Sequence, residues 1–188
     1  MTEIKMKDLK ASIADVLPVM KKGERNHINV LTHALVESDG TQVWLQATDR
    51  FIIVNSTFAW GDDLPVFKFL TSIQALTAIK SYGANARVTV DGDGFHISSG
   101  ANEICYGQDG NYDWPDMAKL FDQAWGDKNY YTPGENTAPV AFTPLLVKHI
   151  KDVKLYPRLN DSYRPSRFAA GGRVRGVIMP VKIPATEL

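Results

Sequence analysis

Alternating acidic residues and glycines in the middle of the chain have the residue types of a calcium site. Asp91-Gly92-Asp93-Gly94 begins like the calcium loop of a helix-loop-helix pair, in which oxygen ligands also stand at the fifth and twelfth positions. Phe95 and Asn102 occupy those positions here, so the required carboxylates are missing. Because alternating apolar residues flank the stretch, the sequence predicts a β-hairpin with a tight turn and no metal site.

The sequence holds no other pattern that is typical of catalysis or metal binding. The four histidines have neither H-x-x-x-H spacing nor partner cysteines, so no zinc site is predicted. There is no Gly-x-Ser-x-Gly elbow and no glycine loop that could hold a phosphate. The single cysteine, Cys105, excludes an intrachain disulfide, and its strand-like surroundings predict a small buried thiol. We therefore expect a protein that is not an enzyme, with no catalytic residue, metal or cofactor.

Lysines on three predicted helices are the residues that could contact a ligand. They fall away from the apolar stripes of those helices, where they could contact DNA phosphates without reading the base sequence. The candidate contacts for double-stranded DNA are Lys7, Lys10, Lys80, Lys148 and Lys151. An ordinary solvated helix face is the alternative, and Asp15 and Asp152 on the same helices favour it.

The charge of the whole chain does not decide between these alternatives. Lysine plus arginine and aspartate plus glutamate both number 21 among 188 residues, so an electropositive surface could come only from the arrangement of side chains. The N-terminal segment MTEIKMKDLK is charged, and no apolar run approaches the length of a secretory signal or a membrane span. We expect a cytoplasmic protein that does not contact a membrane.

The predicted helices recur in a fixed order with predicted strands. Apolar residues at helical spacing predict a first helix over residues 6–22, which Pro18 kinks or ends early. Strand-like runs follow over residues 27–38, 41–48 and 51–60. One helix followed by three strands is the first occurrence of the pattern.

The same order appears twice more along the chain. The second occurrence has a strand over 65–69, a helix over 71–82 and three strands between 86 and 108. The third has a strand over 139–142, a helix from Thr143, and strands around 157–160, 166–170 and 177–179. Three β-α-β-β-β units predict an α+β fold with helices on one face of antiparallel sheets.

The repeated units suggest where the chain divides. We expect residues 1–118 to form one domain of two half-domains and residues 138–188 to form a third half-domain. Residues 119–137 between them are rich in aromatic residues, aspartate, glycine and proline without clear periodicity, which is typical of a connector.

Three short stretches, LQATDRFIIV (residues 45–54), DGNYDWPDM (109–117) and VIMPVKI (177–183), follow one another along the chain. The first resembles the Ala-Thr-Asp strand turn of the bacterial DNA polymerase III β sliding clamps, and the second resembles their connector, Asp-Gly-x-Phe-Pro-Asp-Tyr. The third resembles their C-terminal Val-Met-Pro-Met-Arg-Leu. Together with the order of elements over nearly the whole chain, the resemblance implies a sliding-clamp fold built from β-α-β-β-β half-domains.

The resemblance also implies a site. In that family, helices line a hole through which duplex DNA passes, and a cleft built partly from the Thr-Asp turn and partly from the Met-Pro segment takes a short peptide from polymerases and other replication proteins. The positions that match, and that we take as partner-binding candidates, are Thr48, Asp49, Arg50, Phe51, Met179, Pro180 and Val181. The family's Gly-His-Arg after Thr-Asp is replaced here by Arg50-Phe51-Ile52.

The chain departs from the family in length, because family members have six half-domains and this chain has three predicted ones. An unpaired half-domain would expose an apolar helix stripe and a sheet edge, so we expect a homo-oligomer or docking on another clamp-like protein. The implied function is that of a DNA polymerase processivity factor in DNA replication. The alternative is a clamp-like adaptor or decoy that binds the host clamp or its partners without forming a ring. A short, neutral clamp suits a bacteriophage, so the expected location is the cytoplasm of a bacterial or phage-infected bacterial cell.

Overall fold

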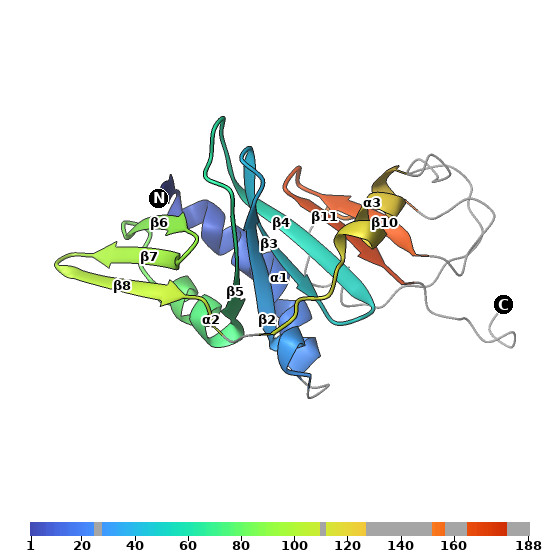
Figure 1. Cartoon of the computed structure of the whole chain (residues 1–188), viewed down its shortest axis with the longest axis horizontal. Coiled ribbons are helices and arrows are strands. Elements are labelled where there is room, and N and C mark those ends of the chain that lie inside the picture. Colours follow the sequence, from blue (N-terminus) through green and yellow to red (C-terminus); the bar gives the residue numbers. More distant parts are fainter. Residues whose placement is uncertain (25–27, 110–111, 127–151, 157–164, 180–188) are drawn as a thin grey trace, which may run out of the picture.

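The computed structural model describes residues 1–24, 28–109, 112–126, 152–156 and 165–179 (Figure 1). The first unit contains β1 (Thr2–Ile4), α1 (Met6–Glu24), the short 3-10 helix η1 (Asn29–Thr32), β2 (His33–Ser38), β3 (Gln42–Thr48) and β4 (Ile52–Trp60). The second contains β5 (Phe67–Ser72), α2 (Ile73–Ser81), β6 (Arg87–Asp91), β7 (Gly94–Ser99) and β8 (Asn102–Gly107). They are followed by α3 (Ala118–Gly126), β9 (Lys154–Tyr156), β10 (Ser166–Ala170) and β11 (Val174–Ile178).

The helix α1 forms because apolar side chains recur every three or four residues along it. Leu9, Ile13 and Met20 are fully buried on one face of the helix. Pro18 does not end the helix, which continues to Glu24. It lies on the half-exposed face, where solvent can hydrate the carbonyl group that loses its hydrogen bond.

The first two units exchange their first strands. β1 of the first unit pairs with β6 of the second, and β5 of the second pairs with β2 of the first, both antiparallel. One sheet therefore has the order β1-β6-β7-β8, and the other begins with the order β5-β2-β3-β4. Because each unit completes the sheet of the other, the two share one continuous hydrophobic core.

The strands after α3 extend the larger sheet. β11 pairs antiparallel with β4 over five residue pairs, and β10 and β9 follow it, so the sheet has seven strands. Gly176 of β11 stands opposite Phe168 of β10, and a Cβ atom there would lie 2.1 Å from the Phe168 ring and 2.4 Å from the Ile53 carbonyl oxygen. Glycine is required at this position because the ring covers the backbone.

The two faces of the larger sheet are covered by different helices (Figure 1). Ile52 and Ile178 point into the main core with α1, which packs on β3 and β4 and lies beside α2. Ile53 and Val177, the next residues along the same strands, point to the opposite face and are buried with Ala124 of α3. The alternation of side chains along paired strands therefore gives the sheet two apolar faces.

The structure confirms the predicted hairpin and the α+β organisation. β6 and β7 pair antiparallel from Arg87↔Ser98 to Asp91↔Gly94, which leaves a two-residue turn at Gly92-Asp93. The third unit's predicted strand over 139–142 and its helix from Thr143 lie outside the described residues. Its predicted strand around 157–160 lies there too, directly after the described strand β9.

Two predictions from the sequence are wrong. The strand predicted over 27–38 begins only at His33, because residues 29–32 form η1, which turns the chain from α1 into β2 and buries Leu31. Cys105 is exposed, because β8 is the last strand of its sheet and no neighbour covers its outer edge. A third difference is an addition, since the segment predicted as a connector contains α3, a helix that the sequence did not indicate.

Candidate functional site

The two segments that the sequence predicts as one site meet in the structure. The turn between β3 and β4 carries Thr48 to Phe51, and β11 ends at Ile178 beside the start of β4. Ile178 pairs with Ile52, and the Met179 N–H donates to the Phe51 carbonyl oxygen at 2.8 Å. Segments that lie about 130 residues apart along the chain thus form one surface. Pro180 and Val181 lie outside the described residues.

Asp49 organises the turn from a fully buried position. Its Oδ1 accepts hydrogen bonds from the Phe51 amide at 2.9 Å and the Ile52 amide at 2.8 Å, and its Oδ2 lies 2.7 Å from Lys22 Nζ of α1. Thr48 is also buried, and its hydroxyl oxygen accepts a hydrogen bond from the Arg50 amide at 3.2 Å. These two predicted site residues therefore shape the turn and do not present a surface to a partner.

Arg50 and Phe51 are the exposed residues of the turn. Arg50 has a φ of 83°, a left-handed conformation that is unfavourable for a residue with a Cβ atom. Phe51 is 53% exposed, and Lys22 Nζ lies 5.5 Å from the centre of its ring. Phe51 and the half-buried Met179 beside it form an apolar surface, which Arg50 and the Lys22–Asp49 ion pair border.

The outer face of the same strands is closed by α3. Met117, Leu120, Phe121 and Trp125 pack with Ala124 over Ile53 and Val177. The guanidinium groups of Arg167 and Arg175 each lie 5.4 Å from the centre of the Trp125 ring, which fixes the helix to β10 and β11. A partner could therefore reach the turn and the end of β11, but not the apolar pair beneath α3.

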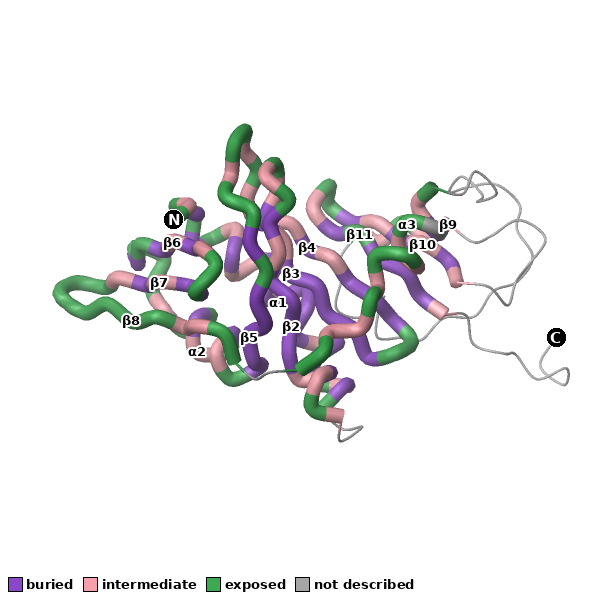
Figure 2. The backbone as a smooth tube through the Cα atoms, in the orientation of Figure 1, coloured by how far each residue is buried: buried purple, intermediate pink, exposed green. Residues whose placement is uncertain are grey.

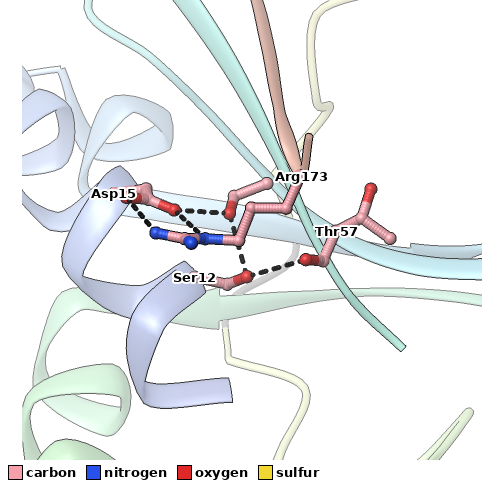
Figure 3. Close-up of polar contacts among 5 residues, drawn as sticks. Ser12, Asp15, Thr57 and Arg173 are labelled. Carbon is pink, nitrogen blue, oxygen red and sulfur yellow. Dashed lines mark hydrogen bonds and ion pairs between the residues drawn. The ribbon is translucent and has the colours of Figure 1, made fainter. Parts of the chain in front are cut away.

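A buried aspartate links α1 to the turn between β10 and β11 (Figure 3). Arg173 Nε donates to Asp15 Oδ2 at 2.9 Å, and Arg173 Nη2 donates to Asp15 Oδ1 at 3.2 Å. The Ser56 hydroxyl also donates to Asp15 Oδ2 at 2.8 Å, and the Ser12 hydroxyl donates to the Thr57 carbonyl oxygen at 3.2 Å. Asp15 is only 6% exposed, so it requires these partners. The interpretation of Asp15 as part of a solvated helix face is therefore wrong, and the only signal for its burial was its place at the margin of an apolar helix stripe.

A recess of about 310 Å³ lies on the outer side of the larger sheet, under residues 114–118 and the start of α3. Within it, Trp114 Nε1 donates to Gln46 Oε1 at 2.8 Å, and Gln46 Nε2 donates to Asn55 Oδ1 at 2.8 Å. The remaining polar lining includes Glu37 and Lys68. These contacts attach the segment before α3 to β3 and β4, and no sequence pattern predicted them.

The Asp91 side chain makes its hydrogen bonds within its own hairpin. Asp91 Oδ1 accepts a hydrogen bond from the Asp93 amide at 2.9 Å and lies 3.1 Å from His96 Nε2. Burial alone would raise the pKa of Asp91, but the Asp93 amide and His96 outweigh it and hold the pKa below its usual value. Over the described ranges, no group of three or more histidine, cysteine, aspartate or glutamate side chains could hold a metal ion.

The predicted DNA-binding lysines are only partly grouped. Lys7 on α1 and Lys80 on α2 are exposed, and their helices lie side by side. Lys10 is half-buried and donates to the Tyr82 carbonyl oxygen at the end of α2. This hydrogen bond holds its ammonium group against the protein. Lys148 and Lys151 lie outside the described residues. In the parts of the chain that are described, no helix is both long and apolar enough to cross a membrane.

Solved structures resemble the chain over nearly its whole length. The β subunit of DNA polymerase III from Thermotoga maritima gives a TM-score of 0.69 at 12% identity, with 99% of this chain and 66% of that chain covered. The β chain from Streptococcus pneumoniae gives 0.69 at 13% identity, with 97% and 65% covered. The DNA polymerase sliding clamp from Bacillus subtilis gives 0.66 at 13% identity, with 97% and 64% covered.

The chain has the sliding-clamp fold. At these identities the likeness concerns the fold alone, and the chain spans just under two thirds of the length of the clamps that it matches. No protein-family model matches the sequence, and no curated protein matches it significantly.

Proposed function

We propose that the chain is a sliding-clamp-like DNA replication accessory protein. It would bind double-stranded DNA without sequence specificity and tether a DNA polymerase or another clamp-binding protein, with no reaction of its own. The observation that carries this proposal is the meeting of the Thr48–Phe51 turn with the end of β11, within the fold of proteins that are named sliding clamps. Thr48 and Asp49 shape this surface through hydrogen bonds to the turn, and Arg50 and Phe51 are exposed on it.

The exposed part of the junction suits a peptide of mixed character. The Phe51 ring and the half-buried Met179 offer apolar contact, and the exposed Arg50 supplies positive charge beside it. The charge of Lys22 is balanced by Asp49. An aromatic or aliphatic side chain next to a carboxylate would match both features. Pro180 and Val181 follow directly in the sequence and remain part of the proposed surface.

The proposed DNA surface is the side of α1 and α2 that faces away from the sheets. Lys7, Lys21 and Lys80 are exposed there. We include Lys148 and Lys151 because the sequence predicts them on the helix that begins at Thr143. Few lysines mean few phosphate contacts, so binding should be weak, with a salt dependence of about one unit of log–log slope for each lysine that contacts phosphate.

A binding titration on duplex DNA tests this surface. We expect the double variant Lys7→Glu/Lys80→Glu to bind more weakly and its salt dependence to flatten, by about one unit of log–log slope per lysine that contacts phosphate. The variant Lys148→Glu/Lys151→Glu should behave in the same way. Lys68→Glu, an exposed lysine on β5, is the matched control and should leave binding unchanged. Equal binding by all of these variants would assign the lysines to an ordinary solvated surface.

DNA synthesis on a primed circular template tests the complete function. Added protein should lengthen the products made per binding event by a bacterial replicative polymerase, and Phe51→Ala should remove this effect without weakening DNA binding. A protein that stays monomeric and shows no salt-dependent DNA binding would contradict a clamp that closes around DNA as a ring.

The equal numbers of acidic and basic residues and the three-unit length favour a second candidate function. In it, the chain is an adaptor or decoy that binds the host clamp or its partners without encircling DNA. Recovery of a purified bacterial β clamp by the tagged chain in the absence of DNA, with no stimulation of synthesis, would favour this function over the first.

A further inference from the structure

The recess on the outer side of the larger sheet has a floor of strands and a roof of connecting chain. Its floor comes from β2, β3, β4 and β5, and its roof is the segment 114–118 with the start of α3. Figure 2 shows this segment in front of the buried strands, and residues 112–122 are all exposed or half-buried. A volume of about 310 Å³ is at the lower end of the range for binding sites, which suits one long side chain with its adjoining backbone.

Two tryptophans line the recess, one from the floor and one from the roof. Trp44 belongs to β3, and Trp114 lies in the segment that crosses the sheet. The Trp114 ring is held in place because its Nε1 donates to Gln46 Oε1 at 2.8 Å. Indole rings attract cations through the negative charge of their faces, and the attraction is stronger where water is excluded. The aromatic lining therefore favours a positively charged ligand group.

The charged side chains of the recess have the same preference. The lining contains three carboxylates, those of Glu37, Asp116 and Asp122, against the single ammonium group of Lys68. The half-buried Glu37 stands opposite Trp44 on one side and Lys68 on the other, yet it forms no ion pair with this described lysine. A cation placed between Glu37 and Trp44 would contact a carboxylate and an aromatic ring at once.

The amide groups on the floor of the recess indicate which cation fits. Gln46 is only 6% exposed, and its Nε2 donates to Asn55 Oδ1 at 2.8 Å. The amide oxygens of Gln46 and Asn55 each accept one described hydrogen bond, so each has an acceptor position left. A guanidinium group only donates hydrogen bonds, its plane stacks on indole rings, and its edge pairs with carboxylates. An ammonium group cannot stack in this way, so the lining fits arginine better than lysine.

We propose that this recess binds an arginine side chain of a partner protein. The guanidinium group lies against Trp44 and Trp114 and donates to the Glu37 carboxylate, while Asp116 and Asp122 attract the positive charge at the rim. The recess shares no lining residue with the surface formed by the turn between β3 and β4 and the end of β11. The proposal therefore adds a second binding site and does not depend on the proposed function.

Nuclear magnetic resonance of the full chain in DNA-free buffer tests the proposal, with N-acetylarginine amide as the probe. The indole N–H signals of Trp44 and Trp114 should shift in a saturable way, with a dissociation constant on the order of millimolar because one side chain supplies the contacts. The signal of Trp60, an exposed tryptophan outside the recess, should not follow the same curve. Replacing each tryptophan in turn by phenylalanine assigns the signals.

Two further probes serve as controls for the guanidinium group. N-acetylcitrulline amide has nearly the same shape without the charge and should cause no saturable shift at Trp44 or Trp114. Nα-acetyllysine amide carries the charge without the planar group and should bind more weakly than the arginine probe. The proposal would be overturned by the absence of a saturable shift with the arginine probe, or by equal binding of either control probe.

Substitutions at two opposed positions of the floor should act in opposite directions. Glu37→Gln removes the carboxylate that pairs with the guanidinium group, so the dissociation constant of the arginine probe should rise by about threefold or more. Lys68→Gln removes the competing positive charge, so the constant should fall by about twofold. Glu103→Gln, at an exposed position on β8, is the matched control and should leave it unchanged. Changes of the same sign at both floor positions, or no change at either, would overturn the proposal.

The same titration separates this site from the proposed function. Phe51→Ala and Lys7→Glu/Lys80→Glu change residues that do not line the recess, so these variants should bind the arginine probe as the unchanged chain does. This result is expected even if the chain neither binds DNA nor stimulates synthesis. Equal weakening of probe binding by these variants and by Glu37→Gln would contradict a site in the recess.

Discussion

The strands β4 and β8 hold the same place in their units, but one is covered and the other is open. β4 pairs with β11, packs on α1 and lies under α3, while β8 has a neighbour on one side and exposed residues over most of its length. Their sequences differ accordingly, since β4 begins with three buried apolar residues and β8 begins with Asn102-Glu103. Position in a repeated unit therefore does not decide exposure, and the side chains indicate whether the sheet continues.

The covered edge, between β4 and β11, is also held by specific contacts that the open edge of β8 lacks. The β4–β11 edge is backed by the Asp15–Arg173 ion pair, a glycine under an aromatic ring, and a turn built around a buried carboxylate. The residues of β8 present none of these features in the described contacts. The first edge is therefore closed within the chain, and the second is left open among the described strands.

The largest expected effect comes from removing the buried carboxylate of the covered edge. Asp15→Ala leaves Arg173 and the Ser56 hydroxyl without their acceptor, so the free energy of unfolding should fall by about 3 kcal/mol. Urea denaturation measures this loss. Glu24→Ala, another acidic-to-alanine change on α1 but at an exposed position, should change stability by less than about 0.5 kcal/mol.

A double-mutant cycle sharpens the interpretation of that result. If Arg173→Ala in the Asp15→Ala background costs nearly nothing further, the two residues stabilise the junction as one unit. Fully additive losses would mean that Asp15 acts through Ser56 and not through Arg173.

The next effect concerns the glycine of the covered edge. Gly176→Ala would place a methyl group within 2.4 Å of both the Phe168 ring and the Ile53 carbonyl oxygen, so β11 must shift away from β4. We expect a loss of about 2 kcal/mol in the free energy of unfolding, with faster hydrogen exchange at the Met179 amide. Gly83→Ala is the control, because nothing lies within 4 Å of a Cβ atom there. Equal responses to the two substitutions would contradict the tight contact at β11.

A smaller effect of the opposite sign is expected in the turn that begins β4. Arg50 has a φ of 83°, which glycine adopts without steric cost, so Arg50→Gly should stabilise the protein by about 0.5–1 kcal/mol. Arg87→Gly, in the extended backbone of β6, should instead destabilise it by a similar amount. A loss of stability on Arg50→Gly would show that the side chain makes a contact worth more than the strain.

The smallest effect is kinetic and belongs to the open edge. Cys105 is exposed to solvent, but partial desolvation of its thiol and the neighbouring carboxylates Asp91, Asp93 and Glu103 raise its pKa. A raised pKa means that less thiolate is present near neutral pH, so alkylation by iodoacetamide should be a few-fold slower than in the unfolded chain and should accelerate above the ordinary thiol pKa. Glu103→Gln should shift the pH–rate profile toward lower pH, while the exposed but distant Glu3→Gln should not. Identical profiles for the folded and unfolded chain would contradict the shift.

Much of the fold could be predicted because it is recorded in local patterns. Apolar spacing predicted α1 and α2, and the Gly92-Asp93 turn between alternating residues predicted the β6–β7 hairpin. The Thr48-Asp49 turn and the Met179-Pro180 segment predicted a shared surface, although only through their resemblance to a known family. The helix α3 was missed because it is short and its aromatic residues face strands that are distant in sequence.

The sequence by itself determined the repeated units, the lack of known catalytic motifs and the strands that flank each turn. The tertiary structure alone decided which site residues are exposed, because burial of Asp49 depends on Lys22 of α1 and access to Ile53 depends on α3. It also decided that Cys105 is exposed and Asp15 buried, against what their neighbours in sequence suggest. Local patterns report the period of a strand or a helix, whereas the fate of an edge depends on whether a distant strand or helix covers it.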